Sequence, residues 1–242
     1  MENELDLEKF KNRIIHRKII QKREGTYIDF PEKLHDEIKT NLASKGIKQL
    51  YGHQVEMFNK SQNGENIVIT TSTASGKTLS FLLPVLNRIL NKPSTRAIFI
   101  YPTKALASDQ LKSILPIIEF FGKDKINIGI YDGDTPPNER GRIRKEANII
   151  LTNPEMVNSA FLPHHSKFGF EYIFKNLEFV VIDELHYYRG AFGSHIANVL
   201  RRLKRISKYY NSIPQFFCST ATIANPIELA ENIFNEKFCL VN

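Results

Sequence analysis

Short apolar runs alternate along the chain with segments of helical periodicity. The apolar runs predict buried strands at Asn66–Thr70, Arg96–Tyr101, Ile126–Tyr131, Asn148–Thr152, Glu178–Ile182, Gln215–Ser219 and Lys237–Val241. Helices are predicted between most of these runs, at about Leu79–Leu90, Lys104–Phe120, Asn138–Lys145, Ser194–Tyr209 and Ile227–Phe234. About seven strands that alternate with helices predict an α/β fold, with a mostly parallel sheet flanked by helices on both faces.

The first part of the chain has a weaker pattern. Residues 1–30 carry a loose helical stripe of apolar residues from Leu5 to Ile20. We interpret them as an N-terminal extension that packs on the main domain rather than binding nucleic acid. A helix is predicted over Pro31–Lys45, and it ends at Gly46, a residue type that favours helix ends. Since no internal repeat or low-complexity linker follows, residues 31–242 are predicted to form one domain.

One short stretch joins a predicted strand to a predicted helix. It reads Thr71, Ser72, Thr73, Ala74, Ser75, Gly76, Lys77 and Thr78. In this context Gly-Lys-Thr is typical of a phosphate-binding loop, whose backbone N–H groups and helix N-terminus contact phosphate oxygens. Lys77 is then expected to bind the β- and γ-phosphates and the Thr78 hydroxyl to bind Mg²⁺. The usual pattern begins with Gly or Ala where Thr71 stands, so a turn that contains Gly-Lys-Thr by chance is the alternative.

Paired carboxylates end a second predicted strand. Asp183 and Glu184 directly follow the apolar run that ends at Ile182. Asp183 is expected to hold Mg²⁺, and Glu184 to orient or deprotonate the attacking water. A solvated acidic turn is the alternative. The phosphate loop upstream favours the catalytic interpretation, because phosphoryl transfer needs both positioning and charge neutralisation.

Two weaker signals accompany these motifs. Gln54 lies upstream of the phosphate loop, and its amide can donate and accept hydrogen bonds to adenine at once. A buried or capping Gln is the alternative. Ser219, Thr220 and Thr222 lie at the end of another strand or just after it, where they are expected to hydrogen-bond the Asp183–His186 turn and to transmit the nucleotide state to a bound partner. Helix capping is the alternative for such hydroxyl residues.

Composition narrows the class of protein. The 242 residues are 42% hydrophobic and 24% charged, which is typical of a globular protein, and no apolar run approaches the roughly 18 residues of a membrane span. The acidic N-terminus does not resemble a secretory signal. With only Cys218 and Cys239, a disulfide framework and a cysteine zinc cluster are excluded, so a cytoplasmic setting is expected. The net charge of +7 is compatible with DNA or RNA binding and equally with a basic surface of no such function.

The order of the motifs resembles the first RecA-like motor domain of superfamily 2 helicases of the DExH type. The resemblance covers nearly the whole chain beyond residue 26. Leu50–Gln54 resembles the adenine-recognition motif, Asp183–His186 the Asp-Glu-x-His box, and Thr220–Thr222 the Ser-Ala-Thr motif. Two further stretches, Tyr131–Pro136 and Tyr188–His195, are similar to hallmarks of the MrfA/YprA-type DNA repair helicases.

The same resemblance implies where nucleic acid binds. The implied contact residues are Pro102, Thr103, Lys104, Gly133, Thr135, Thr152, Asn153 and Pro154. Each group follows a predicted strand and offers backbone N–H groups, hydroxyls or a Lys, which suit phosphate contacts that position a strand without reading its sequence. The basic residues Arg201, Arg202, Lys204 and Arg205 on a later helix are predicted to be a solvated face rather than a DNA contact.

The resemblance implies an ATP-dependent DNA helicase of the 3′–5′ type that acts in DNA repair. It implies ATP and Mg²⁺ as cofactors, single-stranded DNA as partner and a monomer. The family continues into a second motor domain that supplies an arginine finger, whereas this sequence ends soon after the Ser-Ala-Thr motif. We therefore expect half of a catalytic cleft that hydrolyses ATP slowly by itself. An RNA helicase, a double-strand translocase and a non-hydrolysing nucleotide-dependent interaction module are the alternatives.

Overall fold

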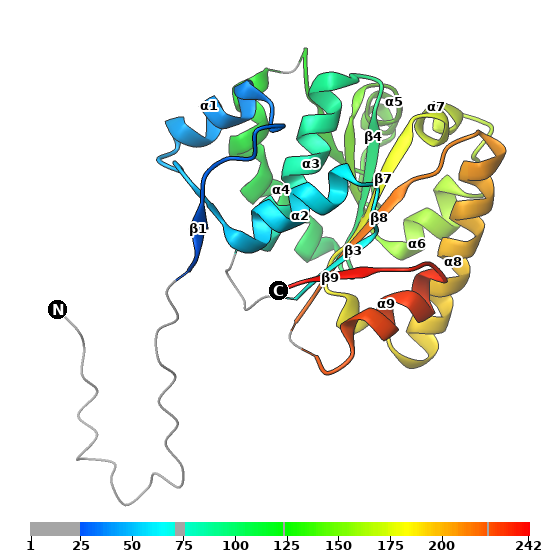
Figure 1. Ribbon diagram of the computed structural model, residues 1–242. Helices are drawn as coiled ribbons and strands as arrows, with labels where there is room; N and C mark the ends of the chain where they lie inside the picture. The colour runs from blue at the N-terminus through cyan, green and yellow to red at the C-terminus, as the bar shows by residue number, and fades with distance from the viewer. Residues whose placement is uncertain (1–24, 71–75, 123, 222) are drawn as a thin grey trace, which may run out of the picture.

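The chain is built around one seven-stranded sheet (Figure 1). The computed structural model describes residues 25–70, 76–122, 124–221 and 223–242. All neighbouring strands of the sheet are parallel, in the order β5-β6-β4-β7-β8-β3-β9, which confirms the predicted sheet. The strands are β3 (Ile67–Thr70), β4 (Arg96–Ile100), β5 (Ile128–Ile130), β6 (Ile149–Thr152), β7 (Leu177–Ile182), β8 (Gln215–Thr220) and β9 (Cys239–Val241).

Helices cover both faces of the sheet, so the strands are buried on both sides. Ile67 and Ile69 pack into one hydrophobic core and Val68 into the other, because side chains alternate along a strand. This double burial explains why the strands read as continuous apolar runs. The first core includes residues of α1 (Asp36–Ser44), α2 (Gly52–Gln62), α3 (Lys77–Asn91) and α4 (Lys104–Ile118). The second includes residues of α5 (Pro137–Glu146), α7 (Phe170–Lys175), α8 (Gly190–Tyr209) and α9 (Pro226–Phe234).

Several short elements were not predicted. The strands β1 (Tyr27–Ile28) and β2 (Leu50–Tyr51) pair antiparallel, so the predicted extension over residues 1–30 ends in a segment that contacts the domain. The short helix α6 (Pro154–Met156) and the single π-turn Val157–Phe161 follow β6. Elements this short show no detectable periodicity, which is why the sequence pattern misses them.

The N-terminal part of the chain differs from the prediction in where its first helix begins. The helix expected over Pro31–Lys45 begins only at Asp36, so its predicted start is wrong; His35 caps it by accepting a hydrogen bond from the Glu37 N–H at 3.2 Å. The helical stripe from Leu5 to Ile20 lies outside the described residues. Within the described ranges, no helix is both long enough and apolar enough to cross a membrane.

The parallel sheet brings the carboxyl ends of its strands to one edge. In the middle of the sheet β8 pairs with β7 on one side and with β3 on the other. Ser219 lies opposite Ile69, and Thr220 lies opposite Thr70. The segments that follow β3, β7 and β8 therefore leave the sheet beside one another, and this is where ligands of such sheets bind.

A close backbone contact fixes the start of α8 against the turn before it. A Cβ atom added to Gly193 would lie 2.6 Å from the carbonyl oxygen of Tyr188. Gly141 in α5 is different, because a Cβ atom there would meet nothing within 4 Å.

We predict opposite effects for alanine at these two glycines. Gly193→Ala should lower the free energy of unfolding by about 1–3 kcal/mol, because the added methyl group must push backbone atoms apart. Gly141→Ala should raise it by about 0.5–1 kcal/mol, because alanine restricts the unfolded chain and favours the helix. Urea unfolding of both variants measures the difference, and equal effects would contradict the close approach at Gly193.

Candidate functional site

The predicted phosphate loop runs from β3 to α3. Thr71, Ser72, Thr73, Ala74 and Ser75 lie outside the described residues, so the structure adds nothing about them. The description resumes at Gly76, which precedes the first residue of α3, Lys77. The strand predicted before this loop and the helix predicted after it are therefore confirmed.

Gly76 is required by its conformation and by its neighbour. Its φ of 78° lies in the left-handed region, which favours glycine. A Cβ atom at this position would lie 2.6 Å from Nε2 of Gln54. The backbone at the start of α3 can thus approach Gln54 only because residue 76 has no side chain.

Gln54 links the predicted phosphate loop to the body of the domain. Its side chain is buried, with Nε2 donating to the Gly76 carbonyl at 3.2 Å and Oε1 accepting from the Tyr51 N–H at 3.0 Å. The second bond is part of a capping box at the start of α2. Capping was the alternative interpretation of Gln54, and the structure shows it. The structure also shows that Gln54 supports the backbone at Gly76. The expected contact with adenine stays a prediction.

The Thr78 hydroxyl has a partner that the sequence did not indicate. It donates a hydrogen bond of 2.9 Å to Oε1 of Gln110 on α4. The hydroxyl proton is thereby directed at Gln110, and the oxygen lone pairs remain available on the other side. Gln110 carries no motif signal, because it is 32 residues away from Thr78 in the sequence.

Asp183 directly follows β7, and its carboxylate hydrogen-bonds to the neighbouring strand β8. The side chain is buried, and Oδ1 accepts from the Ser219 hydroxyl in a short hydrogen bond. Oδ1 also accepts from the Glu184 N–H at 3.0 Å, and this N–H lies 3.3 Å from the Ser219 oxygen. The expected contact between a hydroxyl residue at the end of β8 and the acidic turn is therefore present.

Glu184 adopts a backbone conformation that is rare for its residue type. Its φ of 54° and ψ of 52° are left-handed, which costs of order 1–3 kcal/mol for a residue with a side chain. Such strain is concentrated at functional sites. Its carboxylate lies 3.2 Å from Nδ1 of His186, and the same nitrogen accepts from the Ala221 N–H at 3.4 Å. His186 therefore contacts both the acidic turn and the segment after β8.

Asp183 and Thr78 present the oxygen donors that Mg²⁺ prefers. Within the described ranges, the hydrogen bonds to the Asp183 carboxylate all reach Oδ1, which leaves Oδ2 for a cation. Four hydroxyls are buried without a hydrogen-bond partner in the described part of the chain, those of Tyr101, Tyr188, Ser207 and Thr220. Ser207 lies near the end of α8, whereas Tyr101, Tyr188 and Thr220 lie near the acidic turn. Hydroxyls left unpaired in this way suit a site that is completed by hydrated metal. The residues present fit a magnesium ion.

The residues expected to bind nucleic acid separate into two groups. Pro102, Thr103, Lys104, Asn153 and Pro154 line one surface depression, together with Glu155, Phe192 and His195. Gly133 lies beside Lys104, whose ammonium group forms an ion pair of 2.8 Å with Asp134. This group brings together segments that follow β4, β5 and β6.

The other group is buried. The Thr135 hydroxyl accepts from the Asp132 N–H at 2.8 Å and donates to the Ile130 carbonyl at 3.0 Å. The Thr152 hydroxyl donates to the Tyr131 carbonyl at 2.7 Å, and the residue is 1% exposed. These two side chains hold the loops in shape and present no hydroxyl to the surface.

Thr220 and Thr222 are the remaining residues that were expected at the site. Thr220 is buried at the end of β8 beside the acidic turn, whereas Thr222 lies outside the described residues. The residues that sequence reasoning did not assign to the site are Gln110, Phe192 and His195. Only Phe192 and His195 carry a signal, since they lie in the stretch that resembles a family hallmark.

Comparison with known proteins identifies the class. The model of the DEAD/DEAH box helicase family matches residues 51–230, so the chain belongs to this family. Together with the parallel sheet and its strand-end residues, this membership defines a RecA-like domain of the helicase class. The expected fold class and family are confirmed.

The similarity is strong to a particular group within the class. YprA of Bacillus subtilis, an ATP-dependent helicase by name, is 49% identical over 92% of this chain and 29% of its own length. The ATP-dependent helicase hrq1 of Schizosaccharomyces pombe is 42% identical over 90% of this chain and 21% of its own length. The crystal structure of the DUF1998 helicase MrfA bound to DNA superposes with a TM-score of 0.88 at 49% identity, over 92% of this chain and 29% of that one. The chain thus spans less than a third of these relatives.

We predict that Tyr188 makes the domain sensitive to alkali. Burial, with a smaller contribution from the Asp183 carboxylate, raises the pKa of Tyr188 above its ordinary value of 10.0. As the pH rises past 10, the unfolded chain loses this proton before the folded chain does, so stability falls. Tyr188→Phe should stay within about 1 kcal/mol of the parent at pH 8, because its hydroxyl has no partner in the described residues, and should lose less stability above pH 10.

Urea unfolding at several pH values measures this effect. The exposed Tyr209, replaced by Phe, is the matched control, and it should leave the pH profile unchanged. Equal profiles for Tyr188→Phe and the parent would contradict the prediction.

Proposed function

We propose that this chain is the ATP-binding half of a DNA helicase motor, which couples hydrolysis of ATP to binding and translocation along one strand of DNA. The observation that carries the proposal is the hydrogen-bonded group of Asp183, Glu184 and Ser219 at the strand ends next to the β3–α3 connection. It supplies a carboxylate for a metal and a second carboxylate for water beside a phosphate-binding segment. A role in DNA repair and a cytoplasmic location complete the proposal.

Each residue has a separate task in this proposal. The loop from Thr71 to Lys77 binds the phosphates through its N–H groups and the Lys77 ammonium group. Thr78 and Asp183 would hold a Mg²⁺ ion, which would neutralise phosphate charge. Glu184 accepts a proton from the attacking water. Gln54 selects adenine, and His186, Thr220 and Thr222 transmit the nucleotide state.

The DNA strand lies at the depression lined by Pro102, Thr103, Lys104, Asn153 and Pro154. The N-terminus of α4, at Thr103, offers N–H groups to a phosphate, and Lys104 supplies a positive charge. Gly133 lets the loop after β5 approach Lys104. That MrfA was crystallised with DNA supports DNA rather than RNA as the partner.

Two other functions deserve a direct test against this one. An RNA helicase or double-strand translocase would use the same nucleotide site, and stimulation of ATPase activity by RNA or by duplex would reveal it. A non-hydrolysing interaction module would bind no ATP in the presence of Mg²⁺. The family resemblance also implies an arginine finger from a second motor domain, which would take part in hydrolysis.

Nucleotide binding tests the proposal. Calorimetry should detect ATP binding that requires Mg²⁺, and Lys77→Ala should weaken it more than tenfold, because a charge-assisted contact worth about 1.5–3 kcal/mol is lost. Gln54→Ala should reduce the preference for ATP over GTP. Weakening of both nucleotides by the same factor would contradict adenine selection and leave Gln54 with its support of the Gly76 backbone.

Gln110 should affect the metal-dependent part of this binding alone. Gln110→Ala removes the acceptor of the Thr78 proton, so Mg²⁺-dependent ATP affinity should fall about threefold to tenfold, as expected for a neutral hydrogen bond of about 1 kcal/mol. Gln110→Glu keeps an acceptor oxygen and should keep most of the affinity. Binding of ATP without Mg²⁺ should be the same in all three proteins; a loss there would indicate a general disturbance of α4.

A further inference from the structure

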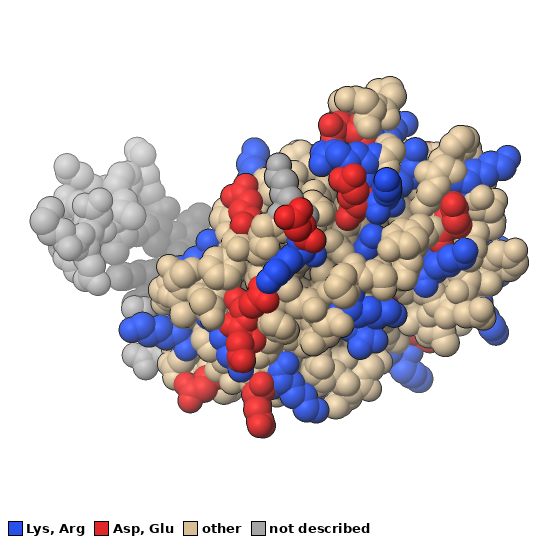
Figure 2. Space-filling view, turned by 90° about the horizontal axis from the view of Figure 1, so that it is seen from above, with Lys and Arg blue, Asp and Glu red and all other residues tan. Residues whose placement is uncertain are grey.

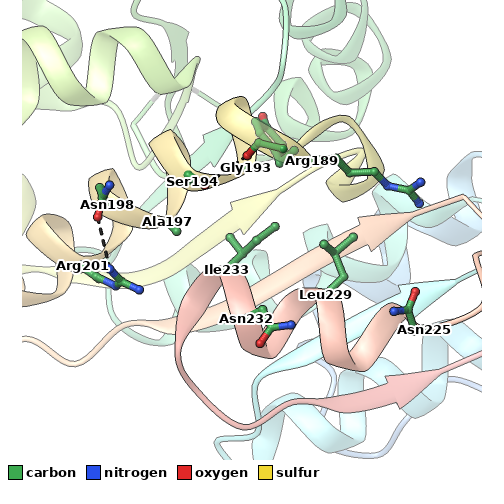
Figure 3. Close-up of a pocket in the computed structure, with 12 residues that line it drawn as sticks. Arg189, Gly193, Ser194, Ala197, Asn198, Arg201, Asn225, Leu229, Asn232 and Ile233 are labelled. Atoms are coloured by element: carbon green, nitrogen blue, oxygen red, sulfur yellow. Dashed lines mark hydrogen bonds between the residues drawn. The ribbon is translucent and has the colours of Figure 1, made fainter.

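The net positive charge does not by itself locate a binding surface on this chain. Its net charge is +7, but Figure 2 shows Lys and Arg side chains spread over the face seen from above, with acidic side chains between many of them. A hollow of about 610 Å³ between α8 and α9 includes two cations in its lining, Arg189 and Arg201. Figure 3 shows these two residues at opposite ends of the hollow, so they do not converge on one ligand. The contacts of single side chains are more informative.

The loop after β5, residues 132–135, is closed by its own hydrogen bonds. Asp132 is buried, and its Oδ1 accepts from the Asp134 N–H at 2.9 Å and from the Thr135 N–H at 3.0 Å. The Asp132 N–H donates to the Thr135 hydroxyl at 2.8 Å. Among these four residues, only Gly133 has an N–H without an acceptor in the described part of the chain.

Arg140 on α5 holds the same loop through its carbonyl groups. Its Nε donates to the Thr135 carbonyl at 2.9 Å. Its Nη2 donates to the carbonyls of Asp132 at 3.1 Å and Gly133 at 3.3 Å. The guanidinium carbon lies 5.6 Å from the ring centre of Tyr131, which is buried. Because the guanidinium group is a rigid planar fork of donors, three carbonyls bound to it fix the shape of the loop.

The contact between Arg140 and the Asp132 carbonyl also sets the direction of the free N–H. This carbonyl and the Gly133 N–H belong to one trans peptide group, in which the two bonds point in opposite directions. Since the carbonyl is directed at Arg140, the Gly133 N–H points away from Arg140. Gly133 is exposed and has no side chain that would cover this donor.

The loop contacts the lysine that we place beside the DNA strand. A Cβ atom added to Gly133 would lie 3.4 Å from Nζ of Lys104, and the same nitrogen forms an ion pair of 2.8 Å with Asp134. An ammonium group has three donors, so two of them remain for a phosphate. The position of the loop therefore determines how Lys104 and the Gly133 N–H lie relative to one another.

We propose that Arg140 is a positioning residue for the DNA strand: it holds the loop carbonyls so that the Gly133 N–H and the Lys104 ammonium group bind the same phosphate. This inference rests on the proposed function as a DNA motor. Arg140 acts through the loop, because its donors are directed at carbonyl groups of the protein. The sequence does not distinguish it from Arg142 and Arg144 on the same helix.

Binding of a labelled single strand to the 242-residue chain tests the proposal. Arg140→Ala should weaken this binding about threefold to tenfold, as expected when one or two hydrogen bonds are lost. Arg140→Lys keeps the charge but lacks the planar fork, so it should lose affinity as well. In a Lys104→Ala background the effect of Arg140→Ala should be clearly smaller than in the parent, because the two residues act on the same phosphate.

Two measurements separate positioning from a general effect. Arg142→Ala is the matched control, since it removes the same charge from α5, where Arg142 pairs with Glu139, and it should keep the parent's affinity for DNA. Mg²⁺-dependent binding of ATP should be the same in the parent and in Arg140→Ala, because the nucleotide site lies at other strands of the sheet. This second measurement also shows that the variant is folded.

Four results would overturn the inference while leaving the DNA motor intact. They are parent affinity for DNA in Arg140→Ala, parent affinity in Arg140→Lys, equal losses in Arg140→Ala and the Arg142 control, and a loss of ATP binding that matches the loss of DNA binding. Full additivity of Arg140→Ala and Lys104→Ala would also overturn it, since Arg140 would then act independently of Lys104. A parent chain that binds no single strand would overturn the proposed function together with the inference.

Discussion

The candidate site depends on the parallel pairing of β8 between β7 and β3. This pairing places Ser219 beside Asp183, so a hydroxyl from one strand positions the carboxylate that ends the next. It also places the segment after β3 at the same edge. A nucleotide site assembled in this way requires no long-range flexibility, because each group leaves a strand that is buried on both faces.

The same edge connects the proposed nucleotide site to the proposed DNA site. Glu184 is held in a strained left-handed conformation, and Nδ1 of His186 lies within reach of both Glu184 and the Ala221 N–H. The Ala221 N–H joins the segment after β8 to His186, and the start of α8 carries Phe192 and His195, which line the depression at Lys104. In the proposed function, His186 is the residue that connects the two sites.

The sequence was sufficient for the sheet and for part of the site. Strands buried on both faces read as apolar runs, and acidic or hydroxyl residues directly after them fall at one edge, so the contact between Asp183 and Ser219 was predictable. The hydrogen bond between Thr78 and Gln110 was not predictable, because a glutamine within α4 carries no signal for a partner 32 residues away. Nor could the pattern distinguish the buried Thr152 from the surface-lining Asn153, since a polar residue after a strand can point either way.

The central claim is that the Ser219 hydroxyl organises the metal-binding carboxylate. Its most direct test is calorimetry of Mg²⁺-dependent ATP binding to the parent chain and to Ser219→Ala. The account predicts that the variant keeps ATP binding in the absence of Mg²⁺ and loses most of the gain that Mg²⁺ provides, because Asp183 and the Glu184 N–H lose their shared partner. An unchanged Mg²⁺-dependent gain in a folded Ser219→Ala protein would contradict the account.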